Sequence, residues 1–240
     1  MSGLFYEFDP GGDVVFVLKD VPHSLPHSLG DLAASDLSGR HDSRQPRPPN
    51  TPAPGPSIGM VNEVKPRSLH IQASSKHMTL ASPQFMRTFQ HGFREGTALH
   101  SVGHVEIPIY DWKPLPFLLL MAILHGRNRL VPRALSLHRL AEMAVLVDYY
   151  ECYDAVVILS DLWIEAVGQD RPYLCGEKLM EWLCITWVFQ RGIDFSLITG
   201  TIQLEIGGVI TANNLPVPAA IIGMYYPSMI ISAALKRNEK

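Results

Sequence analysis

The sequence contains few cysteines and few charged residues. Three cysteines occur in 240 residues, and no two of them form a C-x-x-C pair. An odd number without that spacing argues against a disulfide framework and against a structural zinc site. Charged residues make up 18% of the chain, below the roughly 25% of an average globular protein. The formal net charge of −3 gives no electrostatic reason to expect a nucleic-acid-binding protein.

Sequence motifs for several common catalytic chemistries are also missing. The chain has no phosphate-binding G-x-x-x-x-G-K-[ST] loop, no dinucleotide-binding G-x-G-x-x-G loop and no zinc-binding H-E-x-x-H helix. Weaker candidates are the pair His100 and His104, the pair Asp148 and Glu151, and Cys152. Each is explained more simply, as a solvated histidine, a surface carboxylate or a small buried thiol. We therefore expect no enzyme, no catalytic residue, no cofactor and no metal site.

Signals for export and for membrane insertion are weak. Residues 1–8 include Glu7 and no basic or long apolar run, so a signal peptide is not expected. The stretch from Val209 to Leu235 is apolar and long enough to span a bilayer, but two asparagines and three prolines interrupt it. We expect a soluble protein of the cytoplasm or nucleus. The alternative is a membrane-associated protein anchored through residues 209–235.

Hydrophobic periodicity predicts three strands before the helical part of the chain. Residues 13–18 form a short β-branched apolar run, and Leu69 and Ile71 mark a second strand. Residues 105–109 alternate apolar and polar side chains, and Pro108 among them indicates a strand at the edge of a sheet. Strands followed mainly by helices are typical of an α+β fold.

Helix signals dominate the chain after residue 74. Ser82 and Pro83 fit the N-cap and the first position of a helix. One face of that helix would carry Phe85, Met86 and Phe89. Further helices are predicted at residues 74–80, 117–125, 152–167, 177–189, 193–206 and 218–235, and from Ser136 onward.

A proline-rich segment separates the first two strands. Nine of the nineteen prolines lie between Pro22 and Pro66, and a segment of this composition buries too little apolar surface to offset its ordering entropy. We therefore predict a disordered insert over residues 21–65. Two P-x-x-P sequences within it, at residues 46–49 and 49–52, fit either a ligand for an aromatic-groove receptor or a plain spacer.

Two sequence runs resemble the BTB/POZ domain family. The run from Ile71 to Phe85, Ile-Gln-Ala-Ser-Ser-Lys-His-Met-Thr-Leu-Ala-Ser-Pro-Gln-Phe, is similar to the family's strand and short helix followed by a Ser-x-x-Phe helix start. The run from Leu140 to Ala155, which contains Asp-Tyr-Tyr-Glu-Cys, is similar to the family's later helix and turn. Both runs most resemble those of BTB-only proteins of filamentous fungi. In addition, Gly12-Asp13-Val14-Val15-Phe16-Val17 looks like the family's first strand, and Glu106-Ile107-Pro108-Ile109 resembles the next strand. The residues that carry the resemblance include Asp13, Ser82, Pro83, Phe85, Leu140, Asp148 and Tyr150.

The resemblance implies a fold and a class of activity. The expected fold is α+β, with a small three-stranded sheet capped by a cluster of short helices. Residues 8–20 and 66–168 would form the BTB/POZ domain, and residues 169–240 would form a helical C-terminal extension. The expected activity is protein–protein interaction without a catalytic site, with no small-molecule substrate and no nucleic acid as partner.

Phe93, Arg94 and Glu95 are the candidate partner interface. Gly92 and Gly96 flank these three residues, so we predict a loop here. In BTB/POZ adaptors of cullin-type ubiquitin ligases, a hydrophobic-x-Glu motif lies at a similar place. The resemblance therefore implies a cullin scaffold, or another BTB domain, as the partner. The alternative is that Phe93 only completes the local core.

Overall fold

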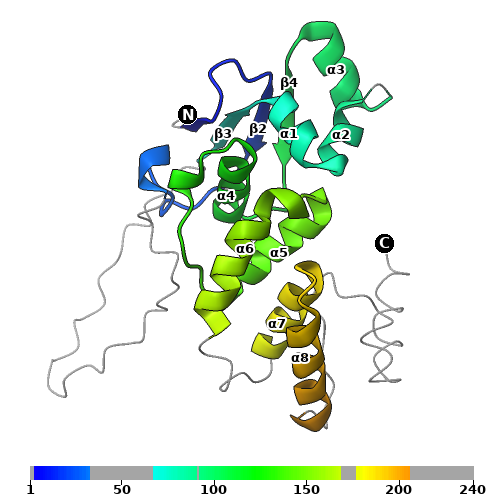
Figure 1. Cartoon of the computed structure of the whole chain (residues 1–240). Helices are drawn as coiled ribbons and strands as arrows, with labels where there is room; N and C mark the ends of the chain where they lie inside the picture. Colours follow the sequence, from blue (N-terminus) through cyan, green and yellow to red (C-terminus); the bar gives the residue numbers. More distant parts are fainter. Residues whose placement is uncertain (1–2, 33–66, 91, 169–176, 206–240) are drawn as a thin grey trace, which may run out of the picture.

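A four-stranded mixed sheet forms the N-terminal part of the protein in the computed structural model, which describes residues 3–32, 67–90, 92–168 and 177–205 (Figure 1). The strands are β1 (Leu4–Glu7), β2 (Val14–Leu18), β3 (Leu69–Ala73) and β4 (Val105–Ile109), in the spatial order β1-β3-β2-β4. β3 runs parallel to β1 and antiparallel to β2, and β2 runs parallel to β4. The predicted α+β class is confirmed.

The sheet has one strand more than the three that were predicted. The three predicted strands are β2, β3 and β4, and the additional one is β1. Leu4 and Tyr6 of β1 are buried, whereas Phe5 and Glu7 are exposed. Four alternating residues are too short a pattern to identify a strand. β1 is instead defined by its pairing with β3, in which Leu4 lies opposite Leu69, sixty-five residues later in the chain.

The position of Pro108 agrees with the sequence. β4 is an edge strand, and Pro108 lies opposite Val17 of β2. Proline has no N–H to donate, so it is tolerated in a strand that has a neighbour on one side only.

In the view of Figure 1, the helices lie beside the sheet and below it. Those in the described residues are α1 (Ser75–Ala81), α2 (Pro83–Phe89), α3 (Arg94–Val102), α4 (Pro114–Leu124), α5 (Leu137–Tyr150), α6 (Tyr153–Val167), α7 (Glu177–Val188) and α8 (Gly192–Glu205), with the short 3-10 turns η1 (Leu29–Asp31) and η2 (Asn128–Leu130). In Figure 1, α1, α2 and α3 lie beside the sheet at one end of the molecule, and α7 and α8 lie at the other.

Helix α3 occupies the place where a loop was predicted at Phe93-Arg94-Glu95. That prediction is wrong, because α3 begins at Arg94 and Phe93 is its N-cap residue. Gly96 is buried in the first turn of α3, and a Cβ atom there would lie 2.0 Å from the backbone oxygen of Gln90. Glycine is needed at this position because α3 approaches the end of α2 so closely, and not because the chain forms an open loop.

The core is built around α4. Every residue from Pro116 to Leu124 is buried, as expected for a helix that is apolar on all sides and covered all round. α4 contacts α1, α5 and α6. From the sheet, the ring of Phe16 packs edge-on against Phe117 with a centroid distance of 5.1 Å, and lies 5.9 Å from Phe85 of α2.

The chain after β2 remains in the core for longer than the proline content suggested. Val21, Leu25 and Leu32 are buried, and the Val21 N–H donates to the backbone oxygen of Arg67 at 3.1 Å. The hydroxyl of Tyr6 donates to the backbone oxygen of Pro26. Residues 21–32 therefore belong to the folded part of the protein, because three apolar side chains anchor them. The rest of the predicted insert, residues 33–65, lies outside the described residues.

The described part of the C-terminal extension packs on the preceding helices. α7 lies against α5, and α8 lies against α7. His138 Nδ1 of α5 is 2.6 Å from Glu181 Oε1 of α7. The buried apolar side chains of α7 belong to the same core as those of α4 and α5, and they are Leu179, Met180, Trp182, Leu183, Cys184, Ile185 and Val188.

Residues 206–240 lie outside the described part of the chain, and so do the predicted helix at 218–235 and the apolar stretch 209–235. Of the helices that the structure does describe, none is long and apolar enough to cross a membrane. α6 has 15 residues, whereas a membrane-spanning helix needs about 20.

Candidate protein-interaction surface

Phe93 is presented to solvent at the start of α3. Its side chain is 57% exposed, so it does not lie in the local core. The backbone oxygen of Phe93 accepts hydrogen bonds from the N–H of Thr97 at 2.9 Å and from the Thr97 hydroxyl at 3.0 Å. These bonds and the close contact at Gly96 fix the backbone on which Phe93 stands. Arg94 is exposed and Glu95 is half-buried beside it.

Other exposed apolar side chains lie on the same group of helices. α2 packs against both α1 and α3, and α3 packs against β4. Leu80 near the end of α1 is 90% exposed, Met86 on α2 is 45% exposed and Val102 at the end of α3 is 64% exposed. Helices α1–α3 lie together at one end of the molecule (Figure 1). This end, including Phe93, is the candidate interaction surface.

Asp13 connects the sheet to α1. This residue directly precedes β2, and its carboxylate accepts hydrogen bonds from the N–H of Ser75 at 2.7 Å and from the Ser75 hydroxyl at 2.6 Å. The first N–H groups of a helix have no partner within the helix. Asp13 therefore satisfies one of them from a different part of the chain.

His125 accepts a backbone hydrogen bond at the start of α1, and nothing in the sequence indicated this role. Its Nε2 accepts a hydrogen bond from the N–H of Ser74 at 2.9 Å, and its Nδ1 is 2.8 Å from the backbone oxygen of Met121. The ring stacks against His77 at 5.2 Å. Burial lowers the pKa of His125, and a neutral ring with its proton on Nδ1 fits both bonds. His125 and Asp13 together hold the N-terminus of α1.

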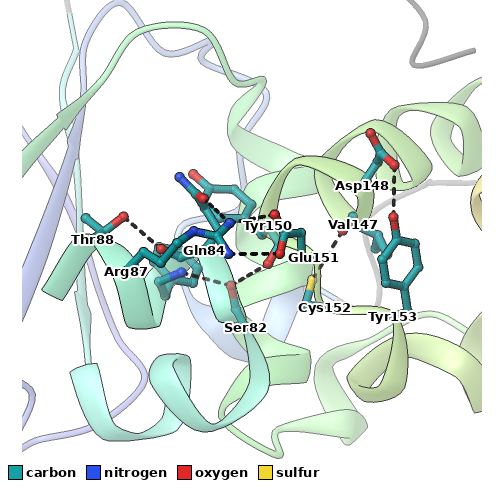
Figure 2. A network of polar contacts seen from close by, with 11 residues as sticks. Ser82, Gln84, Arg87, Thr88, Val147, Asp148, Tyr150, Glu151, Cys152 and Tyr153 are labelled. Atoms are coloured by element: carbon teal, nitrogen blue, oxygen red, sulfur yellow. Dashed lines mark hydrogen bonds and ion pairs between the residues drawn. The ribbon is translucent and has the colours of Figure 1, made fainter. Parts of the chain in front are cut away.

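Ser82, Phe85 and Tyr150 form a buried junction between α2 and α5, and Figure 2 shows Ser82 and Tyr150 within it. The Ser82 hydroxyl accepts from the N–H of Phe85 at 3.0 Å, as the predicted N-cap requires, and donates to the backbone oxygen of Tyr150. The rings of Phe85 and Tyr150 stack with a centroid distance of 4.4 Å. Burial raises the pKa of Tyr150, whose hydroxyl accepts from Trp112 Nε1 at 3.1 Å.

Asp148 and Glu151 do not act as a carboxylate pair. Asp148 accepts a hydrogen bond from the Tyr153 hydroxyl at 2.9 Å, whereas Glu151 pairs with Arg87 of α2 at 2.5 Å (Figure 2). The hydrogen bond from Arg87 lowers the pKa of the exposed Glu151 carboxyl. Each carboxylate thus has its own partner.

The structure also places the remaining residues that the sequence analysis singled out. Pro83 is the exposed first residue of α2, and Leu140 is fully buried in α5. Cys152 is buried, which raises the pKa of its thiol to about 12, so it is protonated at neutral pH. His100 lies on α3 and its Nε2 is 3.2 Å from the backbone oxygen of Phe89, while His104 is exposed.

Two further kinds of site are relevant in the part of the chain that the structure describes, namely metal clusters and hollows. Within residues 3–32, 67–90, 92–168 and 177–205, no group of three or more His, Cys, Asp and Glu side chains is arranged to hold a metal ion. An open hollow of about 430 Å³ lies between α5, α6, α7 and α8 and is lined by Tyr153, Trp187, Phe195 and five other residues. Asp148 is among them, but its carboxylate is bonded to Tyr153.

One catalytic spacing occurs in the proline-rich segment, outside the described residues. Gly55-Pro56-Ser57-Ile58-Gly59 has the form G-x-S-x-G. In α/β-hydrolases the serine of this motif stands on a sharp turn between a strand and a helix. The proline-rich flanks give no sequence signal for either element, so the spacing alone does not identify a nucleophile.

Comparison of the sequence with protein-family models gives no match, and comparison with curated proteins gives none either.

Proposed function

We propose that this chain is a protein-interaction module of the BTB/POZ type that acts as an adaptor and not as an enzyme. The order of the elements supports the proposal. β2 is followed by β3, by the short helix α1 and by α2 with its Ser82-Pro83-Gln84-Phe85 start, and then by β4 and α5. Apart from β1, α3 and α4, which the resemblance did not specify, this is the order that the sequence resemblance implies.

The contacts of the signature residues support the same proposal. Asp13 holds the start of α1, Ser82 caps α2, and Phe85 stacks on Tyr150. These residues are far apart in the sequence and tie the sheet, α1, α2 and α5 together. A set of residues with such a common structural task is a better mark of a fold than any one of them alone.

The observation that carries the functional part is the exposed Phe93 on a fixed backbone. Large aromatic side chains are favoured as energetic centres of protein interfaces, with polar residues around them. Phe93 is 57% exposed, and Arg94 and Glu95 are beside it. The candidate partner is a protein that covers the start of α3. A cullin-type scaffold is one specific version of this partner, and a second BTB domain is the other.

Affinity purification of the full chain, followed by mass spectrometry and measured affinities, tests this proposal. Phe93→Ala should weaken partner binding by about 2 kcal/mol or more, which is about thirtyfold in Kd. The matched control is Ile158→Ala, at an apolar residue on α6 that is 76% exposed and lies outside the candidate interaction surface. Glu95→Ala should weaken binding less and make it more sensitive to salt, because a rim charge acts mainly on association.

The outcomes separate the parts of the proposal. Unchanged affinity in Phe93→Ala would remove the start of α3 as the interface. A partner that depends on Phe93 but is not a cullin would keep the interaction function and end the cullin version. A Phe93→Ala protein that unfolds easily would contradict the exposed position of this ring.

A further inference from the structure

Helix α8 carries large apolar side chains on two sides. Ile198 and Ile202 are buried, whereas Ile193 is 82% exposed and Leu197 is 62% exposed. Ile193 and Leu197 are four residues apart, so they are neighbours on one face, which we call the outer face of α8. Between Gly192 and Ile202 the single charged residue is Asp194, and its carboxylate pairs with Arg191 at 3.3 Å.

A helix with large apolar side chains on two sides is expected to be covered on both. Helices at a protein surface usually carry a polar stripe toward water, and those that are apolar all round are buried. α8 packs against α7. Within the described residues, the outer face is left exposed at Ile193 and Leu197.

The chain that follows α8 has the composition of a cover for this face. From residue 206 to residue 235 there is no charged side chain, and Lys236 and Arg237 come directly after. Gly207 and Gly208 lie immediately after the end of α8, and glycine permits the backbone conformations that reverse a chain. At 1.5 Å per residue, the end of α8 is about 12 Å from Leu197 and about 18 Å from Ile193 along the helix axis.

We propose that residues 209–235 fold back along α8 and cover its outer face through contacts with Ile193 and Leu197. The segment is covalently attached next to the face, so its effective concentration there is on the order of millimolar. A second copy of the chain or a lipid bilayer would have to bind without this advantage and would lose translational freedom on association. The intramolecular contact is therefore the favoured occupant, and this proposal does not depend on the proposed interaction function.

Hydrogen–deuterium exchange with mass spectrometry on the full chain tests the proposal, with light scattering to establish the monomer. Ile193→Glu places a charge on the outer face. It also lies in the first turn of α8, where an acidic side chain is favourable to the helix. The matched control is Ile158→Glu, which introduces the same charge at an isoleucine on α6 that is 76% exposed.

In the wild-type monomer, amides of residues 209–235 should exchange at least about tenfold more slowly than in an unstructured peptide. Ile193→Glu should accelerate their exchange by about tenfold or more, because a buried charge disfavours the covered state. Ile158→Glu should leave their exchange unchanged. Amides of β2 and β3 should exchange equally in all three proteins.

Several results would overturn the proposal. These are unprotected amides at 209–235 in the wild-type monomer, or equal protection in Ile193→Glu. Protection only with phosphatidylcholine–phosphatidylserine vesicles would assign the segment to a membrane. Protection only at concentrations that give a dimer would assign it to a second copy. If Ile193→Glu also accelerates amide exchange in β3, the variant disturbs the fold, and Leu197→Glu is measured in its place. Faster exchange of β3 in both variants would contradict the exposed position of the outer face of α8.

Discussion

Replacement of Asp13 should reveal how much one carboxylate contributes to joining the sheet and α1. Its two hydrogen bonds to Ser75, at 2.7 and 2.6 Å, are the contacts that would be lost. Ser75 is only 8% exposed, so water replaces them poorly. Charge-assisted hydrogen bonds contribute about 1.5–3 kcal/mol, and the loss of a helix cap costs about 0.5–2 kcal/mol. We expect Asp13→Ala to lower the free energy of unfolding by about 2–3 kcal/mol.

Asp13→Asn removes the charge of the Asp13 side chain but keeps its shape. Its amide oxygen still accepts the bond from the Ser75 N–H, and its amide N–H can donate to the serine hydroxyl. We therefore expect a cost of about 1 kcal/mol, which is clearly less than for alanine. Asp111→Ala, at an exposed position before α4, is the control and should stay within about 0.5 kcal/mol of wild type.

Urea unfolding monitored by the fluorescence of the buried Trp163 and Trp182 would measure these differences, with unchanged m-values as the condition for comparing them. A loss of 2–3 kcal/mol corresponds to a fall in Tm of about 4–12 °C for a protein of this size. An Asp13→Ala protein within about 0.5 kcal/mol of wild type would refute the role of Asp13 in holding α1. Equal losses for alanine and asparagine would show that the charge, and not the geometry, dominates.

Three further predictions concern the core and pH. Phe85→Ala should cost about 3–5 kcal/mol because its buried ring stacks on α5, whereas Met86→Ala beside it, 45% exposed, should cost under about 1 kcal/mol; urea unfolding that shows equal costs would mean that the phase of α2 is wrong. Leu32→Ala should cost about 2–5 kcal/mol, and a surface-like value would contradict the burial of residues 21–32. His125 has a lowered pKa in the folded state, so the unfolded state binds its proton more readily, and stability should fall as pH drops below about 6.5. Unfolding at pH 7.5 and pH 5 should show a smaller difference in His125→Gln, and an unchanged difference would assign the pH dependence to other groups.

Local signals in the sequence were sufficient for the elements with strong patterns. Ser82 and Ser136 predicted helix starts, and both side chains accept the expected backbone bonds. The edge position of Pro108 followed from its missing N–H. β1 and α3 were missed because their signals are short or misleading. β1 has only four alternating residues, and the two glycines around Phe93 resemble those of a loop.

The candidate interaction surface was likewise predicted only in part from the sequence. The sequence identified Phe93, Arg94 and Glu95 as residues of interest but assigned them to a loop. Whether a phenylalanine lies in the core or in solvent depends on which elements pack around it, and no local pattern contains that information. The same holds for His125, whose role exists only because α4 brings its ring to the start of α1.

The sequence by itself determined the α+β class, three of the four strands and most of the helices, because apolar periodicity, caps and prolines act through neighbouring residues. Only the tertiary structure decided the pairing of β1 with β3, the ordered packing of residues 21–32 and the docking of α7 on α5. It also decided the capping of α1 by Asp13, which is sixty-two positions before its partner Ser75. Such contacts depend on which distant segments meet, and burial of apolar surface in a shared core selects among those meetings.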